Sequence, residues 1–225
     1  MRLGVVGAIM AFSFTAASAA AETPFERQVL AALNAARTDP AAYAAGLRHY
    51  RTYFHATLLR YPGLDADIET EEGVKVVDET IAFLGRQAPL PPLEGAALFE
   101  TSAADLVADQ AQGGTGHESS DGANPADRAR RHGGGGYVAE VIAYGPVDAA
   151  DVVRQLIVDD GVADRGHRAI LYSPELRFAG VSCGPHPEYR TVCVIDLGIT
   201  PDGRYPTQQR AGIRSGHGSA PVLAG

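Results

Sequence analysis

The chain of 225 residues has no tryptophan and only two cysteines, and basic side chains are in the minority. With 19 lysines and arginines against 27 aspartates and glutamates, its net charge is -8 at pH 7. An acidic chain lacks the clustered basic face that binds phosphate backbones or anionic lipid headgroups. We therefore expect no nucleic acid as a partner and no docking on a charged membrane surface.

Long apolar runs are also scarce. The one run of note, Leu3 to Phe14, is shorter than the ~20 residues that a membrane-spanning helix needs. It follows a positively charged start and precedes small residues, where Ala17-Ser18-Ala19 and Ala19-Ala20-Ala21 both fit the small-x-small cleavage pattern. We therefore expect a signal peptide over residues 1–21, no membrane span, and a secreted or periplasmic protein.

Several short functional motifs are missing. The sequence has no HExxH, no CxxC and no EF-hand loop, which are short-spaced patterns that hold zinc or calcium. The glycine-rich stretches at 113–116 and 133–136 do not follow a strand, so they do not predict a phosphate-binding loop. Ser119 and Ser120 lie near a histidine and acids, but no G-x-S-x-G elbow surrounds them. A nucleotide site and a serine-hydrolase triad are therefore not predicted.

The composition is that of a globular protein, with 45% hydrophobic and 20% charged residues. After removal of a signal peptide, the length suits one domain, or one domain with a tail. From Thr200 the sequence is rich in glycine, arginine, glutamine and serine, which is typical of loosely packed segments. We expect one domain over residues 22–200 and a flexible C-terminal tail over 201–225.

Helix-forming segments come first and strand-forming segments come late. Helical patterns lie at 25–36, 40–54, 74–84, 98–112 and 146–158, with a short further helix after Asn124. Strand patterns lie at 137–144, 178–183 and 189–199. This order predicts an α+β fold in which helices cover a small antiparallel sheet.

The two cysteines, Cys183 and Cys193, flank a Gly/Pro-containing loop between two predicted strands. Such strands would place the two side chains opposite each other, and an oxidising compartment favours a bridge. The sequence therefore predicts a structural disulfide, and the alternative is a pair of reduced, buried small residues.

Polar side chains that could carry chemistry interrupt this pattern. His117 lies in a glycine-rich loop, Glu140 lies within an apolar strand, and His167 precedes a predicted helix. Each residue alone has an ordinary structural interpretation, as a histidine that caps a carbonyl or a glutamate on the solvated face of its strand. The same neighbourhood contains Arg165 and Arg168, which we expect to hold nearby carboxylates, namely Asp159, Asp160 and Asp164.

Short motifs follow one another in a fixed order between residues 25 and 200. They are Leu33-Asn34-x-x-Arg37, Pro40-x-x-Tyr43-Ala44, Pro91-Pro92-Leu93, Ser102-Ala103-Ala104, Gly116-His117-x-x-x-Asp121-Gly122, Arg128-x-x-x-x-Gly133, Glu140-x-x-x-Tyr144-Gly145, Arg165-Gly166-His167-Arg168-x-Ile170-Leu171 and Phe178-x-Gly180-Val181. In this order they resemble bacterial members of the CAP superfamily (the SCP domain). That superfamily includes cysteine-rich secretory proteins, antigen 5 and pathogenesis-related proteins of class 1.

The resemblance implies an α-β-α sandwich with a surface cleft lined by two histidines and two acids, which in several members hold a divalent metal. His117 matches the first histidine, Glu140 the first acid and His167 the second histidine. The second acid is usually a glutamate, and this chain offers Asp159 or Asp160 at its place. The expected cofactor is a divalent metal, zinc or magnesium, because imidazole and carboxylate are ligands that such ions accept.

Three functional hypotheses remain open on the sequence alone. The first is a secreted module that binds a lipid, a peptide or a partner protein in the cleft or in a nearby apolar groove. The second is a metal-dependent hydrolase that uses the same cleft. The third is a structural domain with a vestigial site. The apolar stripes at 43–54 and 74–84 could supply an exposed patch for a lipid, or could pack into the core.

Overall fold

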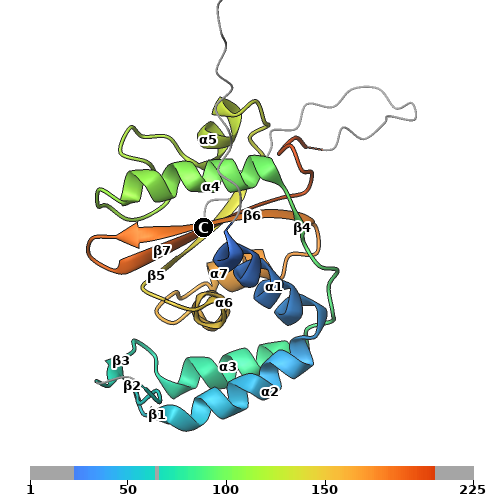
Figure 1. The fold of residues 1–225 in the computed structure, drawn as a ribbon. Coiled ribbons are helices and arrows are strands. Elements are labelled where there is room, and N and C mark those ends of the chain that lie inside the picture. The colour runs from blue at the N-terminus through green and yellow to red at the C-terminus, as the bar shows by residue number, and fades with distance from the viewer. Residues whose placement is uncertain (1–22, 64–65, 206–225) are drawn as a thin grey trace, which may run out of the picture.

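The computed structural model describes residues 23–63 and 66–205 (Figure 1). The predicted signal peptide lies outside these ranges, as do residues 206–225 of the predicted tail. Within the described part the chain forms helices and two small sheets, which confirms the α+β fold class. No helix in that part is long and apolar enough to cross a membrane.

The main sheet has four strands in the order β4-β6-β7-β5. Their bounds are Glu94–Gly95 (β4), Ala139–Tyr144 (β5), Phe178–His186 (β6) and Arg190–Gly198 (β7). β5, β6 and β7 pair antiparallel, and the short β4 pairs parallel with β6. β5 is therefore an outer strand, so residues on it can face whatever lies beyond the edge of the sheet.

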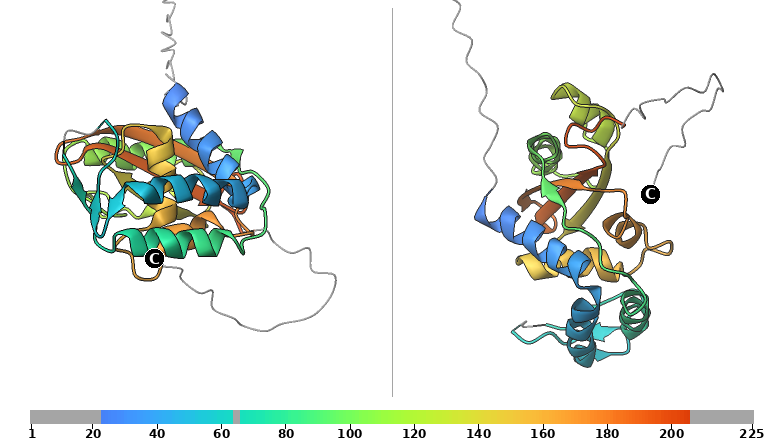
Figure 2. Two further views of the ribbon diagram at one scale, coloured as in Figure 1. Left: turned by 90° about the horizontal axis from the view of Figure 1, so that it is seen from below. Right: turned by 90° about the vertical axis from the view of Figure 1, so that its right-hand side faces the viewer.

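Helices cover both faces of the sheet and form the sandwich that the resemblance implies (Figure 1). One face carries α4 (Ala97–Gln110) and α5 (Pro125–Arg131), and the other carries α1 (Pro24–Thr38), α6 (Ala149–Val158) and α7 (Gly166–Leu171). A further layer contains α2 (Pro40–Tyr50) and α3 (Val74–Leu84), which lie side by side beneath α1 and α6 (Figure 2). The segment between α2 and α3 forms a 3-10 turn, Arg51–Tyr53, and a small sheet of β1 (Phe54–His55), β2 (Leu58–Leu59) and β3 (Ile68–Glu69).

Three of the predicted boundaries differ from the observed ones by about three residues or more, each for a local reason. The second helix stops at Tyr50, because the chain tightens into the 3-10 turn. The helix expected from residue 146 begins at Ala149, because the Asp148 side chain caps it and accepts from the N–H of Asp151. β6 continues to His186, through residues that the sequence pattern assigns to a loop.

The hydrophobic core lies mainly between the sheet and the layer of α1, α6 and α7. Its fully buried members include Val29, Leu33, Val141, Leu156 and Ile195. A smaller cluster on the opposite face packs α4 against β5 and β7, through residues including Ala103, Leu106, Ile142, Val192 and Val194. Alternate residues of β5 and β7 therefore point into different clusters, as the two-residue period of a strand requires.

The first matched motif is structural. Asn34 on α1 pairs with the backbone of Leu93 in both directions, at 2.7 and 2.9 Å. Arg37 is fully buried and donates to the carbonyls of Leu171, Ser173 and Leu176. Burial lowers the pKa of Arg37 to about 10, assisted by nearby Arg177. Asn34 therefore fastens α1 to the segment before β4, and Arg37 fastens it to the end of α7 and the segment that follows. Neither side chain is available to a ligand.

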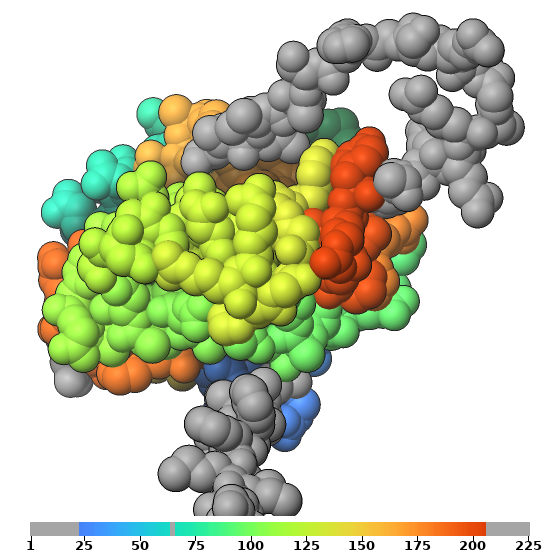
Figure 3. Space-filling model, turned by 90° about the horizontal axis from the view of Figure 1, so that it is seen from above, coloured from blue at the N-terminus to red at the C-terminus, as the bar shows by residue number. Residues whose placement is uncertain are grey.

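The described start of the predicted tail packs against the domain. Gly135 donates its N–H to the carbonyl of Asp202, and Tyr137 donates to that of Gly203, both at 2.8 Å. The ring of Tyr205 contacts that of Tyr137. Figure 3 shows this segment, in red, beside the surface formed by the residues before β5. The packed part of the chain therefore continues past the predicted boundary at residue 200.

The predicted disulfide is confirmed. Cys183 of β6 and Cys193 of β7 are directly opposite each other in the strand register, and their sulfur atoms are bonded. The bridge closes the hairpin that joins the two central strands of the sheet. A disulfide typically contributes about 2–4 kcal/mol to stability.

We predict that Gly180→Ala destabilises the fold by about 1–3 kcal/mol, the usual cost of overpacking. Gly180 of β6 has no room for a side chain, because a Cβ there would overlap the backbone of Phe99 and Glu100 on α4. The matched control is Gly46→Ala in α2, where an added Cβ has nothing within 4 Å. It should stabilise the protein by about 0.5–1 kcal/mol. Urea unfolding of both variants measures the difference, and equal stabilities would contradict the close packing of α4 on β6.

Candidate functional site

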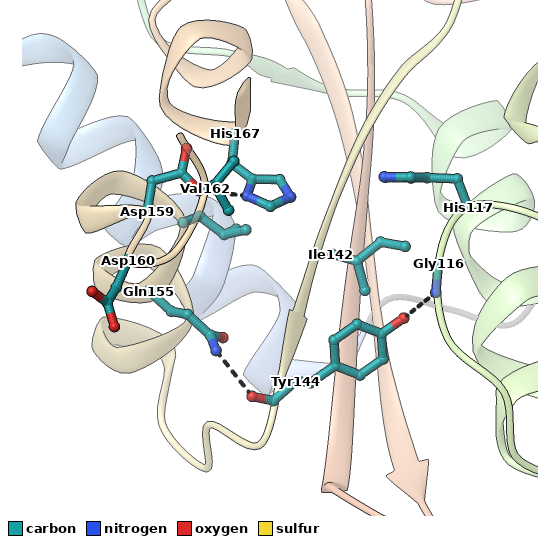
Figure 4. Close-up of a pocket in the computed structure, with 10 residues that line it drawn as sticks. Gly116, His117, Ile142, Tyr144, Gln155, Asp159, Asp160, Val162 and His167 are labelled. Atoms are coloured by element: carbon teal, nitrogen blue, oxygen red, sulfur yellow. Dashed lines mark hydrogen bonds and ion pairs between the residues drawn. The ribbon is translucent and has the colours of Figure 1, made fainter. Parts of the chain in front are cut away.

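A cavity of about 240 Å³ opens beside the outer strand β5. Its walls come from the loop before α5, from β5, from α6, from the α6–α7 connection and from the start of α7 (Figure 4). The lining residues are Gly116, His117, Ile142, Tyr144, Gln155, Leu156, Asp159, Asp160, Val162 and His167. His117 and His167, which lie fifty positions apart in the sequence, therefore share one cavity.

Glu140 holds His117 in place. The Nδ1 atom of His117 lies 2.8 Å from Oε1 of Glu140, whose side chain is 1% exposed against 38% for the imidazole. Glu140 is thus not on the solvated face of its strand. The carboxylate accepts the Nδ1–H, so Nε2 is the nitrogen of the neutral ring that faces the cavity.

Arg128 of α5 supports this arrangement from behind. Its guanidinium is completely buried and forms an ion pair with Oε2 of Glu140. The same group donates to the carbonyl of His117 at 2.9 Å and to that of Ala123 at 3.0 Å. One side chain therefore connects the loop that carries His117 with the carboxylate that orients it.

Tyr144 fixes the other end of the same loop. Its hydroxyl accepts from the N–H of Gly116 at 2.9 Å and donates to the side chain of Gln110 at 3.0 Å. Gln110 in turn donates to the carbonyl of Gly116 at 2.8 Å. Burial raises the pKa of the Tyr144 hydroxyl, so this group remains a neutral donor at physiological pH.

Asp159 holds His167 in the same way from the opposite wall. The Nδ1 atom of His167 lies 2.6 Å from Oδ1 of Asp159, and Oδ2 accepts from the N–H of Arg168 at 3.1 Å. The Asp159 side chain is 1% exposed and the imidazole is 27% exposed. Figure 4 shows the two imidazoles pointing toward one another across the cavity.

Asp160 has a different role from Asp159. Its two carboxylate oxygens accept from the N–H groups of Glu71 and Glu72, each at 2.8 Å. In Figure 4 its carboxylate points away from the histidines. Of the two candidates for the second acid, Asp159 is therefore the one that pairs with a histidine.

A scan with protein-family models matches residues 30–197 to the cysteine-rich secretory protein family, CAP. The chain belongs to this family. A comparison with curated proteins finds no match. Among solved structures, the chain is similar to an outer surface protein from Borrelia burgdorferi, with 15% sequence identity and a TM-score of 0.40. The similarity covers 55% of this chain and 86% of that one.

In this CAP-family chain the carboxylates of the two acids accept hydrogen bonds from the histidines, so they are not free to bind a metal directly. Glu140 accepts from His117 and Arg128, and both oxygens of Asp159 are also occupied. Within residues 23–63 and 66–205, no three side chains of His, Cys, Asp or Glu converge as a metal-binding group. Of the histidines and acids at the cavity, the two histidines are therefore the ones that keep a ring nitrogen free for a ligand.

The family motif around His167 is anchored by α3. Arg165 pairs with Glu72 and Glu79, and Arg168 pairs with Glu79 and donates to the hydroxyl of Thr80. From the sequence we expected these arginines to hold Asp159, Asp160 and Asp164, and that expectation is wrong. The charged partners lie across the layer boundary, on the α3 segment.

The backbone around His167 is held in an unfavourable conformation. Asp159 and Arg165 both have positive φ, at 61° and 56°, a region that residues with a Cβ adopt at a cost of about 1–3 kcal/mol. Arg165 is kept there by its ion pairs and by donation to the carbonyls of Asp159 and Val162. The contacts with α3 therefore stabilise a loop that would otherwise relax.

Sequence reasoning missed the roles of Arg128 and Gln110 at this site. Arg128 belongs to a motif of the family, but only the fold shows that its guanidinium is buried against Glu140. Gln110 belongs to no motif. In the sequence, Gln110 is only a polar residue at the end of an amphipathic helix. Surface helices commonly have such residues, so this pattern does not indicate a site.

We predict that Glu72→Gln makes the α6–α7 connection, which positions His167, less firmly held. The Arg165 guanidinium lowers the pKa of Glu72. The pair therefore stabilises the fold above the unfolded pKa of about 4.3, and this contribution is lost as the pH falls through the lowered value. The variant should be less stable at neutral pH by up to about 1 kcal/mol, with the difference vanishing in acid. It should also shift the NMR signals of the His167 ring.

The matched control for this variant is Asp78→Asn. Asp78 forms a more exposed ion pair with Arg51, whose guanidinium likewise lowers the pKa of its carboxyl partner. This control should reproduce the pH-dependent loss of stability without moving the His167 signals. Equal shifts of His167 in both variants would refute a specific role of Glu72.

Proposed function

We propose that this CAP-family protein binds a divalent metal ion between His117 and His167, with Nε2 of each imidazole as a ligand. The observation that carries the proposal is the pair of buried carboxylates behind the two rings. A histidine that binds a metal usually donates its other N–H to a carboxylate, which fixes the tautomer and makes the free nitrogen more basic.

The donor set favours zinc over magnesium. Imidazole nitrogen suits zinc and other transition metals, whereas magnesium prefers carboxylate, carbonyl and water oxygens. With two protein ligands, the remaining positions are open to water or to a bound molecule. We therefore expect weaker binding than at a structural zinc site with four protein ligands.

A metal bound there would act as a Lewis acid on a polar group of a second ligand. The chain itself supplies the shape of the cavity. Ile142, Leu156 and Val162 line an apolar part, and Tyr144 and Gln155 add polar groups near one end. We propose that the second ligand is a small molecule or part of a peptide that has a polar group at one end and is otherwise apolar.

Hydrolysis is the alternative use of the same cavity. A histidine backed by a carboxylate is also the arrangement that proton transfer requires. Both rings have this support, so either could accept a proton from an attacking water. This alternative requires a substrate that reaches both imidazoles. If the titration described below shows zinc binding, substrates should be screened in the presence of zinc.

A lipid-binding face finds less support. Val77 and Leu84 of α3, and Leu47 of α2, are buried in the core. The exposed large apolar side chains among the described residues are Ile68, Val147, Tyr189 and Tyr205. These four residues lie on different segments of the chain. The apolar side chains of the two stripes pack in or against the core instead.

We also propose that the protein functions outside the cytoplasm, in the periplasm or beyond the cell. The disulfide between Cys183 and Cys193 supports this proposal, since structural disulfides persist in oxidising compartments. The sequence pattern of residues 1–21 points to the same destination.

We predict that the metal-stripped protein binds zinc with a stoichiometry of one, and magnesium far more weakly, in calorimetric titrations. His117→Ala and His167→Ala should each abolish zinc binding, because each removes half of the protein ligands. Asp159→Asn should weaken binding by about 10–100-fold, the usual effect of removing a carboxylate behind a histidine ligand.

The control variant is His132→Ala. His132 also bonds to a carboxylate, Asp105, at 2.7 Å, but it does not line the cavity. Its removal should leave zinc binding unchanged. Absence of zinc binding by the parent protein, or equal loss in the control, would overturn the proposed metal site.

A further inference from the structure

A second buried carboxyl lies behind Glu140. Asp196 of β7 is the direct partner of Glu140 in the antiparallel register of β5 and β7. Asp196 is fully buried and Glu140 is 5% exposed. Directly opposed residues of neighbouring strands point to the same face of the sheet, with Cβ atoms about 4.5–5.5 Å apart. Two carboxyl groups thus stand next to each other in the interior.

Charge around this pair balances only one of the two groups. Among the described residues, the positive charge near both carboxyl groups is that of Arg128. Its guanidinium forms an ion pair with Glu140. From α4 the polar neighbour is Ser102, which carries no charge, and from β6 the register partner is Gly180, which has no side chain. Two buried carboxylates beside one guanidinium would leave a net buried negative charge, which is strongly unfavourable.

The hydrogen bonding of Asp196 points the same way. No described residue donates to either of its carboxyl oxygens within hydrogen-bonding distance, and the hydroxyl of Ser102, which lies near it, also has no partner within that distance. A buried carboxylate normally accepts from several donors, because it is otherwise poorly solvated. A protonated carboxyl supplies its own donor, and its register partner Glu140 offers a carboxylate acceptor beside it.

We propose that Asp196 is a neutral carboxylic acid that donates its proton in a hydrogen bond to Glu140, and is thereby a positioning residue for His117. The pair then carries one negative charge, which Arg128 neutralises. Glu140 remains an acceptor for the Nδ1–H of His117, and its carboxylate is held from three sides.

The pKa of Asp196 supports this assignment. Burial raises it well above its usual range, and the charge of Glu140 raises it further, while Arg128 acts in the opposite direction. The proposal concerns the protein without any ligand in the cavity. It therefore stands or falls independently of zinc binding.

The first test is infrared spectroscopy of the parent protein at pH 7, where exposed carboxyl groups are ionised. We expect a C=O stretching band of a protonated carboxylic acid that shifts in heavy water. Asp196→Asn should remove the band, whereas Asp67→Asn, at an exposed ion pair with Arg60, should leave it. No such band in the parent would overturn the proposal, even if the variant failed to fold.

The second test reads the effect on His117 by nitrogen NMR of the imidazoles. Asp196→Asn keeps an N–H donor beside Glu140 and should preserve the Nδ1–H form of His117. Asp196→Leu removes the donor that holds the Glu140 carboxylate, so the carboxylate is less well fixed and the Nδ1 signal of His117 should shift, while His167 remains unchanged as an internal control. Identical His117 spectra in both variants would show that Asp196 does not position this ring.

Stability gives an independent third measurement. A raised pKa in the folded state means that Asp196 takes up a proton on folding once the pH exceeds its unfolded pKa of about 3.9. Its contribution is therefore most favourable in acid and is lost as the pH rises. Relative to the parent, Asp196→Asn should gain in melting temperature between about pH 4 and pH 7. A difference that is constant with pH would contradict a protonated Asp196.

Discussion

The buried ion pair between Arg128 and Glu140 is the interaction on which the cavity depends. It joins α5 to the outer strand β5, and the same guanidinium binds the carbonyls of the loop that carries His117. Removal of one partner of a buried pair leaves the other charge unpaired, at a cost of about 3–5 kcal/mol. The position of His117 is therefore tied to the stability of the α4–α5 side of the sandwich.

His167 is positioned from the opposite side by an independent set of contacts. Asp159 orients the ring, and Arg165 fastens the loop to Glu72 and Glu79 on the α3 segment. The layer of α2 and α3 thus acts on the cavity although neither helix lines it. The two histidines line the same cavity because the loop that carries His117 and the start of α7 that carries His167 face each other beside β5 (Figure 4). Separate sets of contacts hold these two segments.

Membership of the cysteine-rich secretory protein family accounts for the fold and for the order of the motifs. It does not by itself assign a reaction, because one fold supports many functions. By the resemblance of the motifs, an aspartate stands in this chain where a second glutamate is usual. Asp159 nevertheless reaches His167, because it caps α6 in a left-handed conformation that places its side chain beside the start of α7.

The sequence by itself determined the helices, the main strands, the disulfide and the candidate residues of the cavity. Apolar periodicity and residue order carry that information, since both depend on neighbours along the chain. Only the tertiary structure decided between Asp159 and Asp160, gave Arg165 its partners on α3 and placed Asp196 against Glu140. Most of these contacts join residues far apart in sequence, and they depend on strand register and on the sign of φ at single residues. A linear pattern contains neither quantity, because both are set when the layers pack together.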